Sequence, residues 1–157
     1  MAQNRGKQYE EKLKEDFLKI PEAFIYRIPD QLGGFKGATG ICDFIGFLYP
    51  SIFFLEAKTR LGNTFSIADL TQFDKLMSIP DYKGIHRGVM LWFQDHDKVI
   101  YVPILTIDKM KHDGKKSVNI RTIDKEGYNY LNIPSTKRRV FMDSDYSVLK
   151  NLPEQGW

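Results

Sequence analysis

The stretch that most constrains the fold of this chain covers residues 40–58. Two short runs rich in Ile and Phe lie on either side of Tyr49-Pro50-Ser51, and such runs separated by turn residues predict two antiparallel strands. Pro50 disfavours a tight primed turn, so we expect a four-residue loop with the same centre. That centre pairs residues whose numbers sum to 99, which sets Asp43 directly opposite Glu56.

Opposed carboxylates repel each other across a sheet, so Asp43 and Glu56 require a compensating cation. Mg²⁺ accepts two hard oxygen ligands and leaves other positions for water and a substrate phosphate. Lys58 lies on the same face as Glu56, because side chains alternate along a strand. It is suited to stabilise charge on a phosphate or to orient an attacking water, as a metal-dependent phosphodiesterase requires. The alternative on spacing alone is a solvated hairpin end without chemistry.

Length and composition favour one globular domain over residues 1–157. The chain contains no run of about eighteen apolar residues and begins without the apolar region of a signal peptide. We therefore expect a cytoplasmic protein, in a bacterium or a phage-infected host, with no membrane association. Cys42 is the single cysteine, which excludes an internal disulfide and a Cys-based zinc site, and its strand position favours a buried apolar filler.

The net charge of +3 is distributed unevenly. Residues 98–157 carry 11 Lys and Arg against 7 Asp and Glu, whereas residues 1–97 carry 12 against 13. We interpret residues 104–157 as a basic C-terminal elaboration of the domain. Its basic clusters alternate with aromatic residues, which suits a surface that contacts phosphates, although a solvated edge is the usual explanation.

Two elements precede the hairpin. Apolar residues at helical spacing predict an amphipathic helix over residues 7–20, and Glu10 lies near the edge of its apolar face. A strand over 23–28 leads into a Gly-rich segment over 29–40. We interpret that segment as a mobile arm with Lys36 at its tip, and an ordinary connecting loop is the alternative.

Further elements follow the hairpin. The pattern Ser66-Ile67-Ala68-Asp69 predicts a capping box at the start of a second helix. Strands are expected over 88–93 and 99–103, the first buried on both faces because it is almost entirely apolar. A short helix is expected over 107–111.

Asp43, followed by Glu56-Ala57-Lys58 and preceded by a helix that bears Glu10, resembles the PD-(D/E)XK nuclease core. Within that superfamily the chain resembles the RecU-type Holliday junction resolvases. The segments that carry this resemblance also include Asn4-Arg5-Gly6, Phe65, the strand pair from Gly88 to Tyr101, and Gly114-Lys115-Lys116-Ser117-Val118.

The resemblance implies a mixed α/β fold, with an αβββαβ core whose central sheet is flanked by helices. It also implies a homodimer that uses Mg²⁺ or Mn²⁺ to make paired incisions in four-way DNA junctions. Glu10, Asp43 and Glu56 become the expected metal ligands, and Lys58 becomes the catalytic lysine. The candidate DNA-binding residues are Arg5, Lys36, Lys115, Lys116, Lys137, Arg138 and Arg139.

The chain also departs from the RecU pattern. Cys42 stands where these enzymes often have Thr, Gln72 or Asp74 only loosely matches a polar helix position, and the 29–40 segment is shorter than the RecU stalk. Two alternatives therefore stay open: a PD-(D/E)XK nuclease for duplex or other branched DNA, and a noncatalytic DNA-binding module. For a homodimer, the helix over 7–20 and the apolar residues beyond Val99 are candidates for the shared surface.

Overall fold

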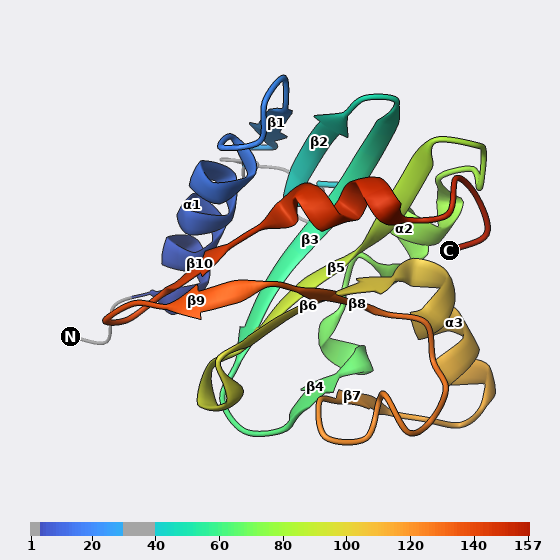
Figure 1. Ribbon diagram of the computed structural model, residues 1–157. Coiled ribbons are helices and arrows are strands. Elements are labelled where there is room, and N and C mark those ends of the chain that lie inside the picture. The colour runs from blue at the N-terminus through green and yellow to red at the C-terminus, as the bar shows by residue number, and fades with distance from the viewer. Residues whose placement is uncertain (1–3, 30–39) are drawn as a thin grey trace, which may run out of the picture.

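The computed structural model describes residues 4–29 and 40–157, and a six-stranded sheet forms its centre (Figure 1). The strand order is β1-β2-β3-β5-β6-β8. Strands β3 and β5 are parallel and all other neighbours are antiparallel, so the sheet is mixed. The bounds are β1 Phe24–Arg27, β2 Phe44–Leu48, β3 Ser51–Arg60, β5 Ile85–Phe93, β6 Lys98–Pro103 and β8 Leu131–Ile133.

Helices and two small ribbons surround this sheet. Strand β4 pairs with β7, and β9 pairs with β10. The bounds are α1 Arg5–Phe17, β4 Thr64–Ser66, α2 Phe73–Ser78, α3 Ile104–His112, β7 Ser117–Asn119, β9 Ser135–Lys137 and β10 Met142–Ser144, with 3₁₀ helices η1 Ile67–Asp69, η2 Gln94–His96 and η3 Tyr146–Asn151.

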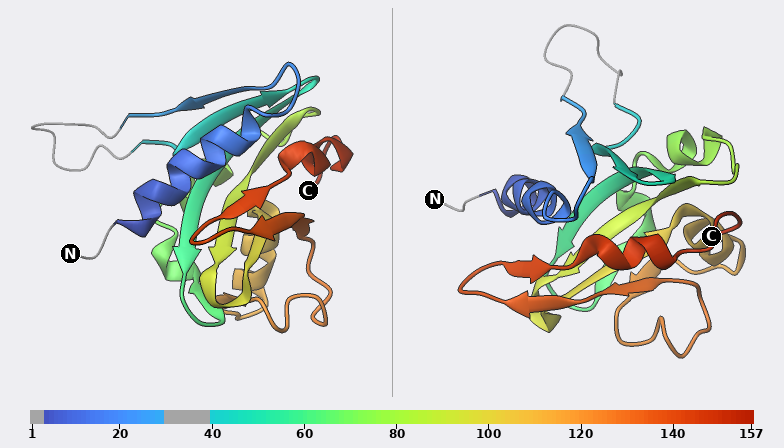
Figure 2. Two further views of the ribbon diagram at one scale, coloured as in Figure 1. Left: turned by 60° about the vertical axis from the view of Figure 1, so that its left-hand side comes forward. Right: turned by 45° about the horizontal axis from the view of Figure 1, so that its top comes forward.

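Helix α1 lies on one face of the sheet, across β1 to β3 (Figure 2, left). The side chain of Asn4 caps its first turn by accepting the N–H of Lys7. The helix ends at Phe17, earlier than the predicted 7–20, although Ile20 is still buried in the same core. Gly46 of β2 permits close approach, because a Cβ there would lie 2.9 Å from the Phe17 ring.

Helices α2 and α3 cover the opposite face of the sheet, where a second apolar core forms. The predicted capping box at 66–69 is wrong. Ser66 belongs to β4, which pairs with β7, and its side chain makes no capping hydrogen bond. Asp69 instead forms an ion pair with Arg60, and α2 begins only at Phe73. The pairing of β4 with β7 therefore determines the structure of this segment, and the pattern within residues 66–69 does not contain that pairing.

The remaining predicted elements are present, with shifted ends. Strand β5 is buried along nearly its whole length, as its apolar sequence predicts, and α3 contains the short helix expected over 107–111. The order α1, β1, β2, β3, α2, β5 confirms the expected αβββαβ core. No helix in the described part of the chain combines the length and apolar character needed to span a membrane.

Much of the surface suggested for a dimer contact is buried within one chain. The apolar residues of α1, including Leu13 and Phe17, are buried against the sheet. The apolar residues of β6 from Val99 to Val102 are also completely buried. Beyond β6, Val140 is exposed, as is Leu18 at the end of the predicted 7–20 helix, so the shared surface stays a prediction.

Candidate active site

The β2–β3 hairpin has the predicted register. Phe44 pairs with Leu55 and Leu48 with Ser51, so the numbers of paired residues sum to 99. The connection itself differs from the expected four-residue loop: only Tyr49 and Pro50 lie between the paired strands, joined by a cis peptide bond. The expected four-residue loop and the observed two-residue connection have the same centre. The predicted register is therefore correct although the predicted loop length is not.

Asp43 lies one residue before β2, where β1, β2 and β3 meet. Its backbone carbonyl accepts the N–H of Ile28 at 2.8 Å, and its own N–H donates to the Leu55 carbonyl at 3.1 Å. Its Oδ2 accepts the N–H of Ala57, also at 2.8 Å. The carboxylate is thereby held against β3 next to Glu56.

Glu56 holds its carboxyl group in an almost completely buried position, with 1% of its surface exposed. Burial, together with the nearby charge of Asp43, raises the pKa of Glu56 from 4.5 to about 7, although Lys58 acts in the opposite direction. Its Oε1 lies 2.9 Å from the Lys58 Nζ, whereas its Oε2 is buried without a hydrogen-bond partner. A buried carboxylate oxygen without a donor is costly unless a proton or a cation satisfies it.

Lys58 projects from the same face of β3 as Glu56, as strand alternation predicts. About a quarter of its side chain is exposed, so its ammonium group lies between the buried carboxylate and solvent. The structure thus brings together three of the four predicted catalytic side chains, Asp43, Glu56 and Lys58.

Glu10 is placed differently. It lies on α1 and pairs with Arg27 of β1, at 2.7 Å between Oε2 and an Nη atom and 2.8 Å to Nε. Its charge still contributes to the raised pKa of Glu56, as the smallest of the causes. Within residues 4–29 and 40–157, no group of three or more His, Cys, Asp or Glu side chains is arranged to hold a metal ion. The role of Glu10 as a third metal ligand stays a prediction.

The donor set itself fits a divalent cation. Asp43 and Glu56 offer hard oxygen atoms, and the unpartnered Oε2 of Glu56 is the atom that most needs one. A cation there would also offset both causes of the raised Glu56 pKa, burial first and the charge of Asp43 second. The two carboxylates would therefore be its protein ligands, with further positions left for water and phosphate.

Cys42, next to Asp43, is buried as predicted. Its thiol donates to the Phe44 carbonyl at 3.2 Å, and burial raises its pKa to about 12. A thiol in this state is not nucleophilic, which agrees with the expected role as an apolar filler.

The predicted DNA-binding residues that the structure describes are on the surface but do not form one cluster. Lys115 and Lys116 line a groove of about 600 Å³ together with Lys111 and Asp74. Lys115 also pairs with Glu126 at 3.1 Å. Asp74, one of the two loosely matched helix positions, thus lies among lysines at the start of α2.

The other basic residues belong to α1 and to the β9–β10 ribbon. Arg5 stacks over the Phe141 ring at 5.5 Å, and Lys137 pairs with Asp97 at 3.1 Å. Arg139 is exposed on the loop between β9 and β10. Lys36, with nearly all of the predicted 29–40 arm, lies outside the described residues.

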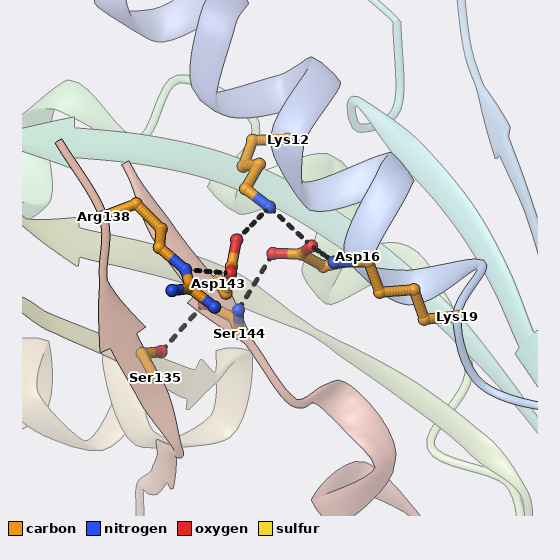
Figure 3. Close-up of polar contacts among 7 residues, drawn as sticks. All are labelled: Lys12, Asp16, Lys19, Ser135, Arg138, Asp143 and Ser144. Atoms are coloured by element: carbon orange, nitrogen blue, oxygen red, sulfur yellow. Dashed lines mark hydrogen bonds and ion pairs between the residues drawn. The ribbon is translucent and has the colours of Figure 1, made fainter. Parts of the chain in front are cut away.

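Arg138 belongs to a polar cluster that joins this C-terminal ribbon to α1 (Figure 3). It pairs with Asp143, and the Lys12 ammonium group lies 2.7 Å from both Asp143 and Asp16. Asp16 also accepts the Ser144 N–H at 2.9 Å. Arg138 is thus partly neutralised and has a structural role that its sequence context did not indicate.

Arg87 is a further buried charge that sequence reasoning did not consider. It lies on β5 and donates to the carbonyls of Leu76, Met77 and Ile79 at the end of α2. These contacts satisfy the carbonyl groups that a helix end leaves open, so Arg87 fixes α2 on the sheet. The sequence does contain a sign of this role, because Arg87 interrupts a strand that is otherwise almost wholly apolar.

Comparison with known proteins gives three findings. The chain matches the RecU family, described as Recombination protein U, over residues 32–140. No curated protein sequence matches it. Among solved structures, it is similar to Archaeoglobus fulgidus Hjc, described as a Holliday junction resolvase from an archaeal hyperthermophile, with 17% identity and a TM-score of 0.49 over 64% of this chain and 78% of that one. The family match covers more than half of the sequence, including Asp43, Glu56 and Lys58, and the chain therefore belongs to the RecU family.

Proposed function

We propose that this protein is a divalent-metal-dependent DNA endonuclease that resolves four-way junctions by paired hydrolysis of phosphodiester bonds. The observation that carries the proposal is the buried Glu56 carboxylate, with one oxygen 2.9 Å from Lys58 and the other without a hydrogen-bond partner. The Oε2 atom of this carboxylate can therefore still bind a cation in the folded protein. Membership of the RecU family supports the same function.

Each side chain of the site has a distinct role in this proposal. Asp43 and Glu56 would hold Mg²⁺ or Mn²⁺, with Glu10 as a predicted further ligand. When bound, the metal supplies Lewis acidity toward a phosphate oxygen. Lys58 stabilises the negative charge that builds up on the phosphate or orients the attacking water, because its ammonium group is fixed by Glu56 at the edge of the solvent.

Two backbone features keep this arrangement rigid. The N–H of Ala57 holds one oxygen of Asp43, and the hairpin register fixes Asp43 beside Glu56. Because both ligands lie on one hairpin, their separation does not depend on contacts between distant elements. Such preorganisation lowers the cost of reaching a reactive geometry.

Affinity for DNA would come from residues outside the site. Arg5, Lys115, Lys116 and Arg139 present cations to solvent or to a groove, as phosphate contacts require. These contacts are not sequence-specific, which suits a nuclease that recognises the shape of branched DNA.

A gel assay tests the proposal directly. A labelled four-way junction, a linear duplex and a flap substrate are each incubated with the protein in Mg²⁺ and in EDTA. We expect symmetric incisions in the junction in Mg²⁺ only, and a large loss of cleavage for Lys58→Ala. The matched control is Lys83→Ala, since Lys83 pairs with Glu154 at 2.8 Å on the exposed surface.

The other outcomes of this assay select the other functions. Equal cleavage of duplex or flap DNA would identify a nuclease of broader specificity. Junction binding without cleavage in either Mg²⁺ or Mn²⁺ would identify a noncatalytic binding module. Loss of cleavage in Lys83→Ala as well would remove the special role of Lys58.

A further inference from the structure

A further hollow of about 290 Å³ lies on the surface outside the lysine-lined groove. Its walls come from β6 with the turn before it, and from residues 120–132, which loop at the lower edge of the molecule before they enter β8 (Figure 1). We call this hollow the β6–β8 pocket, and its polar lining includes Lys98, Arg121, Asp124, Tyr130 and Asn132. None of these side chains has a part in the proposed function, so the pocket needs its own explanation.

Two cations give the β6–β8 pocket its charge. Lys98 and Arg121 are both exposed, and neither has a carboxylate partner within residues 4–29 and 40–157. The carboxylate in the wall belongs to Asp124, which accepts the Tyr130 hydroxyl at 3.3 Å. Two positive charges therefore face one negative charge, and the excess attracts a phosphate group.

The remaining walls offer more than a phosphate requires. Tyr130 is partly buried, and the bond to Asp124 restrains its ring, which can stack on a nucleobase. Asn132 is exposed on β8 and carries an amide that both donates and accepts, the combination that recognises the edge of an adenine. An aromatic ring, an amide and two cations in one pocket match the base and the phosphate of a nucleotide. The volume is close to the lower limit of about 300 Å³ for small-molecule pockets, so one nucleotide fills it.

Strand register places the β6–β8 pocket on the same face of the sheet as the candidate active site. Lys58 pairs with Leu91, Leu91 with Ile100, and Ile100 with Asn132. Paired residues point to the same side, so Lys58 and Asn132 end one row that crosses the sheet. Three strand spacings of about 4.8 Å make this row about 14 Å long. A DNA strand advances about 3.4 Å per nucleotide, so the pocket lies about four nucleotides from a phosphate at Lys58.

We propose that the β6–β8 pocket binds an unpaired nucleotide, with its phosphate on Lys98 and Arg121 and its base against Tyr130 and Asn132. The source of this nucleotide rests on the proposed function: it is a DNA strand near the branch point of a junction, where strands exchange partners and bases unpair most readily. An unpaired base enters such a pocket at the lowest cost, because no base pair has to be broken. Binding there favours branched DNA over a continuous duplex.

A free mononucleotide offers the same chemistry, so the first measurement uses one. Calorimetry of the full chain in EDTA compares 5′-dAMP with deoxyadenosine and with inorganic phosphate. We expect 5′-dAMP to bind at least tenfold more tightly than either, because only 5′-dAMP engages both halves of the pocket. Lys98→Ala/Arg121→Ala should weaken 5′-dAMP binding about tenfold, and Tyr130→Ala about fivefold or more. Lys125→Ala is the matched control, since Lys125 is exposed on the same segment and does not line the pocket.

Tyr130→Phe covers the case in which Tyr130→Ala does not fold. It keeps the ring and should retain most of the affinity for 5′-dAMP. Equal binding of inorganic phosphate and 5′-dAMP overturns the proposal, since the pocket would then take an anion alone. Absence of 5′-dAMP binding overturns it as well, and so does binding that Lys98→Ala/Arg121→Ala leaves unchanged.

Photocrosslinking then tests the DNA source, again in EDTA. Junctions carry one 4-thiothymine at successive positions around the branch point, and mass spectrometry locates the attached residue. We expect crosslinks to residues 120–132 from nucleotides near the branch point, and at least fivefold fewer from a linear duplex or with Lys98→Ala/Arg121→Ala. Equal yield from the linear duplex overturns the proposal, as does 5′-dAMP binding without any crosslink in this segment. Because neither measurement needs cleavage, a chain that passes both and never cuts DNA keeps the pocket and loses the proposed function.

Discussion

Two carboxylates in the described part of the chain are almost completely buried, and their surroundings differ. Asp16, 2% exposed, pairs with Lys12 and Lys19 and accepts the Ser144 N–H. Its charge is therefore balanced and both oxygens have donors. These contacts join α1 to the C-terminal ribbon. They satisfy both carboxylate oxygens of Asp16, so this carboxylate has no need of a bound ligand.

Glu56, 1% exposed, has an incomplete set of partners instead. It has one lysine partner, a second carboxylate nearby and an oxygen without a donor. The comparison teaches that burial of a charge does not by itself indicate function. The useful sign is whether the protein completes the coordination of that charge, as it does for Asp16, or leaves it incomplete.

The largest expected effect is on cleavage. Glu56→Gln and Asp43→Asn should each lower the junction cleavage rate by about 10³-fold or more, because the Lewis acidity of a bound metal contributes several kcal/mol. Binding of the junction in EDTA should be unchanged or tighter, since a negative charge is removed. Single-turnover assays measure the rate, with Glu154→Gln as the control on an exposed ion pair. Full activity in Glu56→Gln would refute the assignment.

Asp16→Ala should cause the largest loss of stability. It leaves the buried Ser144 N–H without an acceptor and Lys12 with Asp143 as its remaining partner, and a buried donor without an acceptor costs about 1–3 kcal/mol. Urea denaturation measures the change, while cleavage per folded molecule should persist. Glu56→Gln should show no such loss. Equal losses in both variants would mean that the two carboxylates do not differ as proposed.

The pH dependence of stability should separate the two carboxylates further. The folded-state pKa of Glu56 is raised from 4.5 to about 7, first by burial and then by Asp43, so the native state binds more protons than the unfolded state between these values. Wild-type stability without metal should therefore fall as pH rises from 4.5 to 7, by about 2–3 kcal/mol relative to Glu56→Gln. Urea titrations at several pH values test this. A constant difference would mean that Glu56 does not titrate in this range.

Addition of Mg²⁺ should recover part of that stability. At a concentration tenfold above its dissociation constant, an ion that binds only the folded state contributes about 1.4 kcal/mol. The melting temperature of the wild type should rise, whereas that of Glu56→Gln should change little. Thermal shifts in Mg²⁺ and in a matched excess of NaCl distinguish site binding from screening. Equal shifts for both proteins would argue against a metal at Glu56.

The smallest effect concerns the C-terminal ribbon. Removing Lys137, Arg138 and Arg139 together should weaken junction binding and flatten its salt dependence, by about one unit of slope for each phosphate that the variant no longer neutralises. Arg138→Ala alone should also loosen the ribbon, because Arg138 pairs with Asp143, whereas Arg139→Ala should leave stability unchanged. Filter binding at several salt concentrations measures the slope. An unchanged slope in the triple variant would exclude a role for these side chains in phosphate binding.

Sequence reasoning succeeded where the determining contacts are local. The alternation around Tyr49 and Pro50 predicts the hairpin and its register, and the structure confirms both through the pairing of Phe44 with Leu55. The αβββαβ order and the RecU family are confirmed as well. The roles of Asp43, Glu56 and Lys58 follow from that hairpin and stay predictions that the experiments above test.

Sequence reasoning failed where distant segments meet. The 66–69 pattern reads as a helix cap only if the pairing of β4 with β7 is ignored. Asp16 looks like an ordinary polar residue of an amphipathic helix, because Ser144 lies 128 positions away. Glu10 likewise meets Arg27 through the packing of α1 on β1. No spacing rule within one segment contains these partners.

The bond between Asp16 and Ser144 also sets an order of events during synthesis of the protein. The ribosome adds Ser144 128 residues after Asp16, and Asp143, which shares Lys12 with Asp16, arrives one residue earlier. Until then Asp16 lacks the backbone donor that its burial requires, so α1 cannot settle on the sheet at full stability. The β2–β3 hairpin, whose contacts are local, can form long before. The packing of α1 over the β2–β3 hairpin therefore depends on a contact that is available only after the C-terminal ribbon has been made.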